Sequence, residues 1–275
     1  MSTSRAFLFD RVPVDGPAGL LTHYTDADLA SPCRSTVPLL ALLKDDWPVF
    51  AAVLTECGVT GEVSVAMEHT EASKASGDRP SFTDAMVTSS TRVLAIEAKW
   101  TEPRYPVVRQ RLERVAPDAD KSTQAEERER NRAFVTGWLD HMRPRATLPL
   151  ALDTFQDCVY QMVHRAASAC GACDTGRTPA LAYLHFTSDS RPACASGNTR
   201  TPPYLDDLSA LHRLLGSPSE FPFFLIDMPM EFTAAFRDIE VLKKGVPQTG
   251  QRVRSSLRDS ELFRFGKPTV HAVGA

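Results

Sequence analysis

Two apolar segments separated by a polar break constrain the fold of this chain more than any other stretch. They run over residues 80–87 and 93–100, with the polar residues 88–92 between them. Short apolar segments joined by a polar turn predict an antiparallel β-hairpin. Because successive side chains of a strand point to opposite faces, Glu97 and Lys99 share one face of the second strand.

The register of this hairpin determines which carboxylates meet. If the turn is centred on Ser90 and Thr91, Asp84 and Glu97 both lie six residues from it and pair across the strands. Directly opposed residues have Cβ atoms about 4.5–5.5 Å apart, and two carboxylates that close repel each other unless a cation lies between them. Such oxygen ligands suit Mg²⁺ or Mn²⁺. A slip of one residue would turn Asp84 to the other face.

Asp84 followed by Glu97-Ala98-Lys99 resembles the motif of the PD-(D/E)xK nuclease superfamily, although Thr83 stands where the family pattern has Pro. The resemblance implies an α/β protein with a restriction-endonuclease-like core, in which helices flank a mixed central sheet. It also implies that Asp84, Glu97 and the carbonyl of residue 98 bind Mg²⁺ or Mn²⁺, and that Lys99 positions or deprotonates the attacking water. The alternative is a solvated strand end with a surface Glu/Lys pair.

Two further glutamates precede the hairpin. Residues 36–57 are expected to form two helices divided at Pro48, with Glu56 near the end of the second. Residues 61–70 alternate apolar and polar side chains, which predicts a strand with Glu68 at its end. The resembling family often has an additional acidic residue in this region. Glu68 is the stronger candidate for a further metal ligand, Glu56 is the weaker one, and a solvated glutamate is the alternative for both.

A second long element follows the hairpin after a charged insertion at 106–146. We predict that residues 152–169 form one helix, in which Gln156 and Tyr160 lie one turn apart on the same face. The Gln-x-x-x-Tyr spacing resembles a pattern that RecB-like and Cas4-like nucleases have after their Glu-x-Lys segment. This resemblance implies that Gln156 and Tyr160 line the active site and orient substrate or metal-bound water. The alternative is a polar seam that packs on the sheet.

The expected domain organisation places a single nuclease-like domain over residues 36–245. An N-terminal arm at 1–35 precedes it, a polar tail at 246–275 follows it, and the charged insertion forms a surface lid or arm. A buried strand near residues 179–190 completes the predicted order of helix, three strands, helix and strand.

The six cysteines are expected to be reduced thiols. The N-terminal residues lack the apolar segment of a signal peptide, and no apolar run is long enough to span a membrane. The sequence therefore predicts a cytoplasmic protein. Cys170 and Cys173 form a CxxC pair. The resemblance to Cas4-like and AddB-like nucleases, which hold an iron–sulfur cluster, implies the alternative to free thiols: a cluster or zinc site that also uses Cys33 and Cys194.

The resemblance to the PD-(D/E)xK superfamily implies a Mg-dependent deoxyribonuclease that hydrolyses DNA phosphodiester bonds, with phage defence or DNA repair as its expected context. The alternative is a catalytically inactive nuclease-fold module that binds nucleic acid or protein. A net charge of −3 argues against a basic field over the whole molecule, so contact with DNA is expected in a local groove. We expect no membrane partner, and the sequence leaves a monomer and a homodimer as alternatives.

Overall fold

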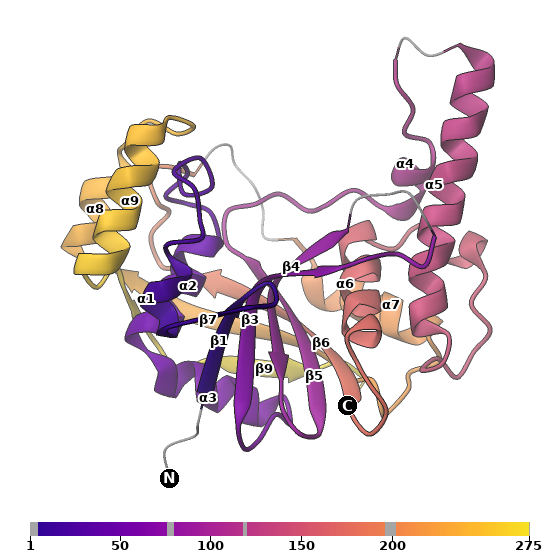
Figure 1. Cartoon of the computed structure of the whole chain (residues 1–275), viewed down its shortest axis with the longest axis horizontal. Coiled ribbons are helices and arrows are strands. Elements are labelled where there is room, and N and C mark those ends of the chain that lie inside the picture. The colour runs from indigo at the N-terminus through magenta and orange to yellow at the C-terminus, as the bar shows by residue number, and fades with distance from the viewer. Residues whose placement is uncertain (1–4, 76–79, 118–119, 196–201, 275) are drawn as a thin grey trace.

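A mixed sheet of nine strands is the centre of the computed structural model, which describes residues 5–75, 80–117, 120–195 and 202–274 (Figure 1). The order is β2-β1-β3-β4-β5-β6-β7-β8, and β9 also pairs with β7. The strands are β1 (Arg5–Phe9), β2 (Val12–Val14), β3 (Val63–Glu71), β4 (Ser81–Thr88), β5 (Arg92–Lys99), β6 (Thr178–Thr187), β7 (Phe223–Phe232), β8 (Phe263–Phe265) and β9 (Thr269–Ala272). The predicted α/β class is confirmed.

Helices cover both faces of this sheet (Figure 1). They are α1 (Gly16–Leu20), α2 (Thr36–Asp45), α3 (Trp47–Glu56), α4 (Val108–Leu112), α5 (Lys121–Met142), α6 (Tyr160–Gly171), α7 (Tyr204–Leu214), α8 (Ala234–Glu240) and α9 (Pro247–Asp259), with a 3₁₀ turn at Leu152–Phe155. Pro48 lies at the start of α3, where its missing N–H costs no helical hydrogen bond. The predicted division of residues 36–57 into two helices is confirmed.

Two apolar cores lie on opposite faces of the sheet, and β5 contributes to both. Leu94 and Ile96 pack into the core that contains α2 and α3. Val93 and Ala95 pack into the core that contains α5 and α6. This alternation confirms the two faces predicted for the strand, and it places the side of β5 that carries Glu97 beneath α6.

The order α3, β3, β4, β5, α6 and β6 confirms the predicted succession of helix, three strands, helix and strand. β3 pairs antiparallel with β4, and β4 pairs antiparallel with β5. β5 and β6 are parallel, so the chain must cross over between them, and α6 lies in that crossover.

The N-terminal and C-terminal segments are more regular than expected. The predicted irregular arm contains β1, which pairs in parallel with β3. The predicted polar tail contains α9, which buries Val253 and Leu257 in a core, and then β8 and β9, which both pair with β7. The N-terminal and the C-terminal segment are each stabilised by contacts with partners elsewhere in the sequence, which local patterns do not reveal.

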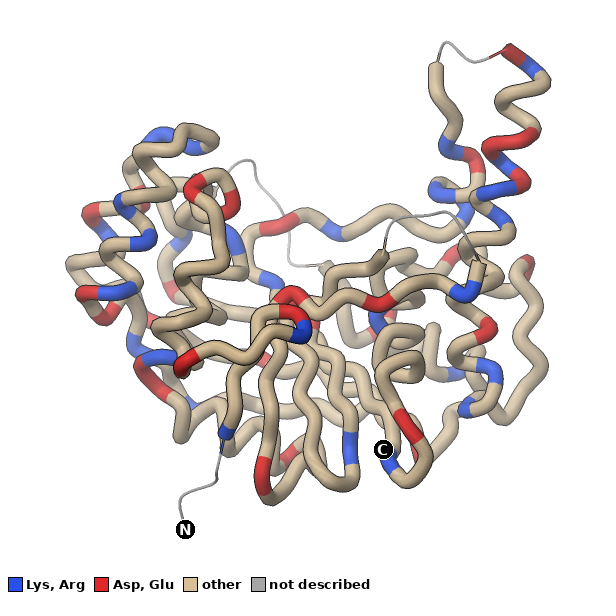
Figure 2. Tube along the Cα trace, in the orientation of Figure 1, with Lys and Arg blue, Asp and Glu red and all other residues tan. Residues whose placement is uncertain are grey.

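The charged insertion forms α5, whose N-terminal part extends away from the sheet (Figure 1). Phe134, Val135, Trp138 and Leu139 of this helix are buried. Figure 2 shows basic and acidic residues interleaved along this helix. None of the helices in the described part of the chain combines the length and the apolar character of a transmembrane span.

Candidate active site

The β4–β5 hairpin places Asp84 opposite Glu97, as the sequence predicts. The paired residues run from Thr88–Val93 to Ala85–Ile96, and one further step in this register aligns Asp84 with Glu97. Oδ2 of Asp84 accepts a hydrogen bond of 2.8 Å from the backbone N–H of Ala98. The Asp84 side chain is therefore held against the strand that carries Glu97.

Glu68 lies at the same level on the neighbouring strand β3. Its flanking residues pair with Ala85 and Thr83 of β4, on either side of Asp84. Glu68 has a φ of 51°, a left-handed conformation that is uncommon outside glycine. Its Oε1 accepts a hydrogen bond of 3.4 Å from the Tyr24 hydroxyl. The predicted approach of Glu68 to Asp84 and Glu97 is confirmed.

Glu56 lies away from these carboxylates. It is an exposed residue at the end of α3. The next residue, Cys57, accepts a hydrogen bond of 2.7 Å through its carbonyl from Arg92, which begins β5. Glu97 and Lys99 lie at the other end of β5. Glu56 is therefore near the opposite ends of the strands and is not placed to share a ligand with Glu97.

Glu97 is buried and both of its carboxylate oxygens are bound. Oε1 accepts hydrogen bonds from Lys99 Nζ at 2.8 Å and from Gln161 Nε2 at 2.6 Å. Oε2 accepts a hydrogen bond from Nε of Arg165, which also donates through Nη1 to the hydroxyl of Ser81. Gln161 and Arg165 lie one turn apart on α6, so this helix supplies two of the three partners.

These side chains line a pocket of about 870 Å³, which we call the acidic pocket. Among the described residues, six acidic side chains line it: Asp10, Asp28, Glu68, Asp84, Glu97 and Glu102. Four basic side chains line it: Arg34, Lys99, Arg104 and Arg165. The surplus of carboxylates makes the pocket a better site for a cation than for an unaccompanied anion.

The carboxylates of the acidic pocket differ in their pKa. Burial raises the pKa of Asp84 well above its ordinary value, and the charge of Glu97 raises it further. Burial also raises the pKa of Glu68. Burial acts in the same direction on Glu97, but Arg165 and Lys99 outweigh it, so the pKa of Glu97 is lowered. Glu97 is therefore a stable anion, whereas Asp84 and Glu68 lack sufficient positive charge around them.

Comparison with known proteins assigns the chain to a family. Residues 13–222 match the family described as "Domain of unknown function (DUF6946)". The chain belongs to the DUF6946 family. No curated protein and no solved structure matches it. The matched residues include β3, β4, β5 and α6, so all the side chains that bind Glu97 lie within the DUF6946 region.

In this DUF6946 protein the predicted roles of Gln156 and Tyr160 require correction. Gln156 lies outside the helix and outside the acidic pocket, and its Nε2 donates to Asp153 at 3.3 Å. The reason is that the chain bridges to the segment before α4 at Val159, so α6 begins only at Tyr160. Tyr160 lines a neighbouring pocket instead.

Gln161 and Arg165 are the functional candidates that sequence reasoning missed. They have the same four-residue spacing as Gln156 and Tyr160, and they lie on the face of α6 that meets β5. The position of the helix start decides which of the two sets faces the sheet. A helix begun at residue 152 puts Gln156 and Tyr160 on one face, whereas in the structure α6 begins at Tyr160 and places Gln161 and Arg165 against Glu97.

The acidic pocket of this DUF6946 protein fits a hard divalent cation in part. In the described chain, no three His, Cys, Asp or Glu side chains converge to form a complete metal site. Both oxygens of Glu97 are already bound, so of the three predicted ligands Asp84 and Glu68 are the two whose carboxylates have fewer charged partners. One or two carboxylates, completed by water and substrate phosphate, are the usual protein contribution to a Mg²⁺ site. Oε1 of Gln161 is buried without a hydrogen-bond partner in the described structure, so it can accept from a water in the pocket.

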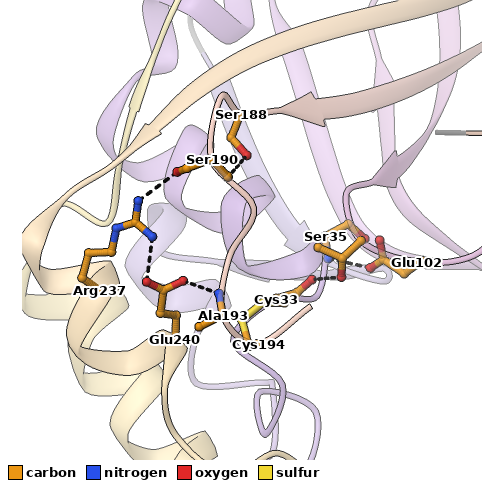
Figure 3. The surroundings of a disulfide bond; sticks show 10 residues. Cys33, Ser35, Glu102, Ser188, Ser190, Ala193, Cys194, Arg237 and Glu240 are labelled. Atoms are coloured by element: carbon orange, nitrogen blue, oxygen red, sulfur yellow. Dashed lines mark hydrogen bonds and ion pairs between the residues drawn. A yellow bond between two sulfur atoms is a disulfide. The ribbon is translucent and has the colours of Figure 1, made fainter. Parts of the chain in front are cut away.

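The cysteine predictions also require correction. Cys33 and Cys194 form a disulfide, not reduced thiols (Figure 3). Cys170 and Cys173 are free, so the four cysteines do not form one metal site. The bridge fixes the segment around Cys33, where the N–H of Ser35 donates to Glu102 at 2.7 Å. Ser35 and Glu102 both line the acidic pocket, and the disulfide therefore anchors part of its wall.

Proposed function

We propose that this protein is a metal-dependent nuclease of the PD-(D/E)xK type that hydrolyses phosphodiester bonds in DNA. The observation that carries the proposal is the alignment of Asp84 with Glu97 in a pocket that also contains Lys99. The succession of helix, three strands, helix and strand supports it, because this is the core that the motif implies. The match to the DUF6946 family covers residues 13–222 and assigns no activity.

Asp84 and Glu68 would hold Mg²⁺ or Mn²⁺ in this proposal. A bound divalent ion lowers the pKa of water and neutralises charge that develops on a phosphate. Both carboxylates have a raised pKa, which means that their charged forms are unfavourable in the buried site. A bound cation would stabilise those charged forms. Neutralising them also removes the electrostatic barrier that the acidic pocket presents to a DNA phosphate.

Lys99 acts in this proposal as a charged donor to the phosphate. Burial lowers the pKa of Lys99, but Glu97 and Asp84 outweigh it, so its pKa is raised and the ammonium group keeps its proton. A protonated lysine stabilises negative charge on phosphate oxygens and does not act as a general base. Glu97 accepts hydrogen bonds from Lys99 and from Arg165. In this proposal Glu97, itself held by Arg165, positions Lys99.

A second candidate function is a nuclease-fold module that binds DNA or protein without cleaving it. The specific observation in its favour is that Lys99, Gln161 and Arg165 occupy both oxygens of Glu97. In a catalytic site of this type, Glu97 would be expected to bind the metal. If its partners do not release it, two of the three predicted ligands, Asp84 and Glu68, are left for that task.

Incubation of the purified protein with labelled linear and circular DNA, in Mn²⁺ or in EDTA, tests the proposal. We expect cleavage in Mn²⁺ that is lost in EDTA and in Asp84→Asn and Lys99→Ala. Gln156→Ala is the matched control, because Gln156 lies outside the acidic pocket and its loss should leave cleavage unchanged. DNA that is bound but uncut by the wild-type protein in Mn²⁺ and in Mg²⁺ would instead support the binding module.

A further inference from the structure

A second pocket of about 670 Å³ adjoins the acidic pocket. We call it the aromatic pocket, because six rings line it: Phe82, Tyr105, Phe134, Trp138, Tyr160 and His164. Phe82, Tyr105, Pro106 and Arg165 line both pockets. A ligand that occupies one pocket can therefore extend into the other past these shared residues.

Two of the shared aromatic residues are unusually exposed. Phe82 on β4 is 49% exposed and Tyr105, in the segment after β5, is 44% exposed. Large exposed apolar side chains that gather beside a hollow are typical of a binding surface. Their position where the two pockets meet suits flat groups that stack on rings, as nucleic acid bases do.

The charges of the aromatic pocket differ from those of the acidic pocket. Among the described residues, the fully charged side chains that line it are all arginines: Arg111, Arg114 and Arg165. Arg111 and Arg114 also line a smaller hollow beside α5, where Arg130 is the third arginine and Glu127 the one acidic side chain among the described residues. This row of guanidinium groups suits the phosphates of a strand that continues away from the acidic pocket.

The interior of the aromatic pocket is lined by uncharged polar rings. Trp138 is 1% exposed, and its indole N–H donates to no group in the described structure. Nδ1 of His164 lies 2.8 Å from the hydroxyl of Ser81. Burial and the charge of Arg165 lower the pKa of His164 well below its ordinary value, so the ring is neutral. Neutral rings are suited to packing against an uncharged heteroaromatic group.

We propose that the aromatic pocket binds an unpaired base of single-stranded DNA whose neighbouring phosphodiester lies in the acidic pocket. This inference rests on the proposed function and adds the form of DNA that the site accepts. A base within a duplex is stacked and paired, and it cannot enter a side pocket unless it leaves the stack. An unpaired base stacks on Phe82 and Tyr105 without that cost.

The test compares oligonucleotides that differ only in their bases. Binding of a labelled thymidine 12-mer, an abasic strand of the same length and a 12-base-pair duplex is measured by fluorescence anisotropy in Ca²⁺, which binds carboxylate oxygens, and separately in EDTA, where no metal-dependent cleavage occurs. We expect the thymidine strand to bind roughly tenfold more tightly than the abasic strand, which has the same phosphates. This comparison uses the wild-type protein and does not depend on the folding of a variant.

Variants then locate the binding site of the base. Tyr105→Ala and Phe82→Ala should each weaken binding of the thymidine strand roughly tenfold and leave the abasic strand unchanged. Tyr105→Phe keeps the ring and should bind like the wild type. Val241→Ala is the matched control, since Val241 is 71% exposed and lines neither pocket. Melting curves confirm that each variant is folded.

The outcomes separate this inference from the proposed function. Equal binding of thymidine and abasic strands, or unchanged binding by both alanine variants, overturns the aromatic pocket as a base site. Asp84-dependent cleavage of duplex DNA with either of these results leaves the nuclease proposal intact. Base-dependent binding that Tyr105→Ala removes, without any metal-dependent cleavage, supports the aromatic pocket and overturns the nuclease proposal.

Discussion

Arg165 on α6 donates a hydrogen bond through Nε to Oε2 of Glu97 on β5, and both side chains are more than nine-tenths buried. The same guanidinium group donates to Ser81 at the start of β4. One side chain thus connects the helix to both strands of the hairpin. It also compensates the charge of Glu97, so it affects stability and the electrostatics of the acidic pocket together.

Removal of Arg165 is expected to destabilise the protein strongly. Arg165→Ala leaves Glu97 buried with fewer positive partners, and breaking a buried ion pair in this way costs about 3–5 kcal/mol. Urea unfolding followed by circular dichroism measures the loss. Arg254→Ala is the control, because its ion pair with Asp26 is more exposed and is worth about 0–1 kcal/mol. Similar losses in the two variants would contradict a special role of Arg165.

Replacement of Asp84 is expected to stabilise the metal-free protein. The folded protein binds the proton of Asp84 more tightly than the unfolded chain does, because the pKa is raised above its ordinary value of 3.8. Stability therefore decreases as the pH rises from 3.8 through the raised pKa, and the full penalty applies above it. Asp84→Asn lacks this penalty. Its melting temperature in EDTA should exceed that of the wild type at pH 7, by about 2–4 °C per kcal/mol relieved.

The pH dependence of that difference provides the control. The melting temperatures of wild type and Asp84→Asn should converge as the pH falls below the raised pKa of Asp84, because the wild-type carboxyl group then becomes neutral. A difference that is constant between pH 4 and pH 8 would show that the titration of Asp84 is not the cause.

Mn²⁺ should raise the melting temperature of the wild-type protein. A ligand that binds only the folded state stabilises it, and in this site Asp84 and Glu68 must lose their protons before they bind a cation. The stabilisation should therefore increase with pH, and it should be absent in Asp84→Asn and reduced in Glu68→Gln. Asp157→Asn is the control, since Asp157 is exposed and lies outside the acidic pocket. An equal Mn²⁺ shift in Asp84→Asn would exclude the proposed metal ligands.

Gln161 and Gln156 should differ in their effect on DNA cleavage. Gln161→Ala removes a donor to Glu97 that positions the carboxylate, and loss of such a supporting contact typically lowers activity about 10–100-fold. Gln156→Ala should cleave like the wild type. Initial rates on a fluorescent oligonucleotide in Mn²⁺ measure both. Lower activity in Gln156→Ala with normal activity in Gln161→Ala would favour the spacing predicted from the sequence.

The disulfide should contribute measurably to stability. Replacing Cys33 and Cys194 by serine removes a bridge between residues 161 positions apart, and loss of a native disulfide typically costs about 2–5 kcal/mol. Melting curves with and without dithiothreitol should show the same loss in the wild type on reduction. Cys173→Ser keeps the bridge and should remain sensitive to reduction. Six titratable thiols in the native, non-reduced protein would contradict the bridge.

The hairpin could be predicted because its information is local. The alternation of apolar residues and the polar turn fix which side chains face each core, and the register of Asp84 and Glu97 follows from counting outward from the turn. Glu68 could be placed for a similar reason, since β3 pairs directly with β4. These are the parts of the candidate site that neighbouring residues in the sequence specify.

The remaining features depend on contacts between distant segments. The start of α6 is set by the bridge between Val107 and Val159, so the helical pattern alone places it too early. The pairing of β1 with β3 spans more than fifty residues, and the disulfide joins segments that only the complete fold brings together. Composition gives only the net charge of the chain, so it could not show that two pockets of opposite character adjoin.

The left-handed backbone at Glu68 has a consequence for how this site can change. Asparagine and aspartate adopt such a conformation more readily than glutamate does. Position 68 can therefore exchange a long acidic side chain for a shorter or a neutral one while β3 keeps its path beside β4. We expect the number of negative charges in the acidic pocket to be adjustable at this one residue by substitutions that the fold tolerates.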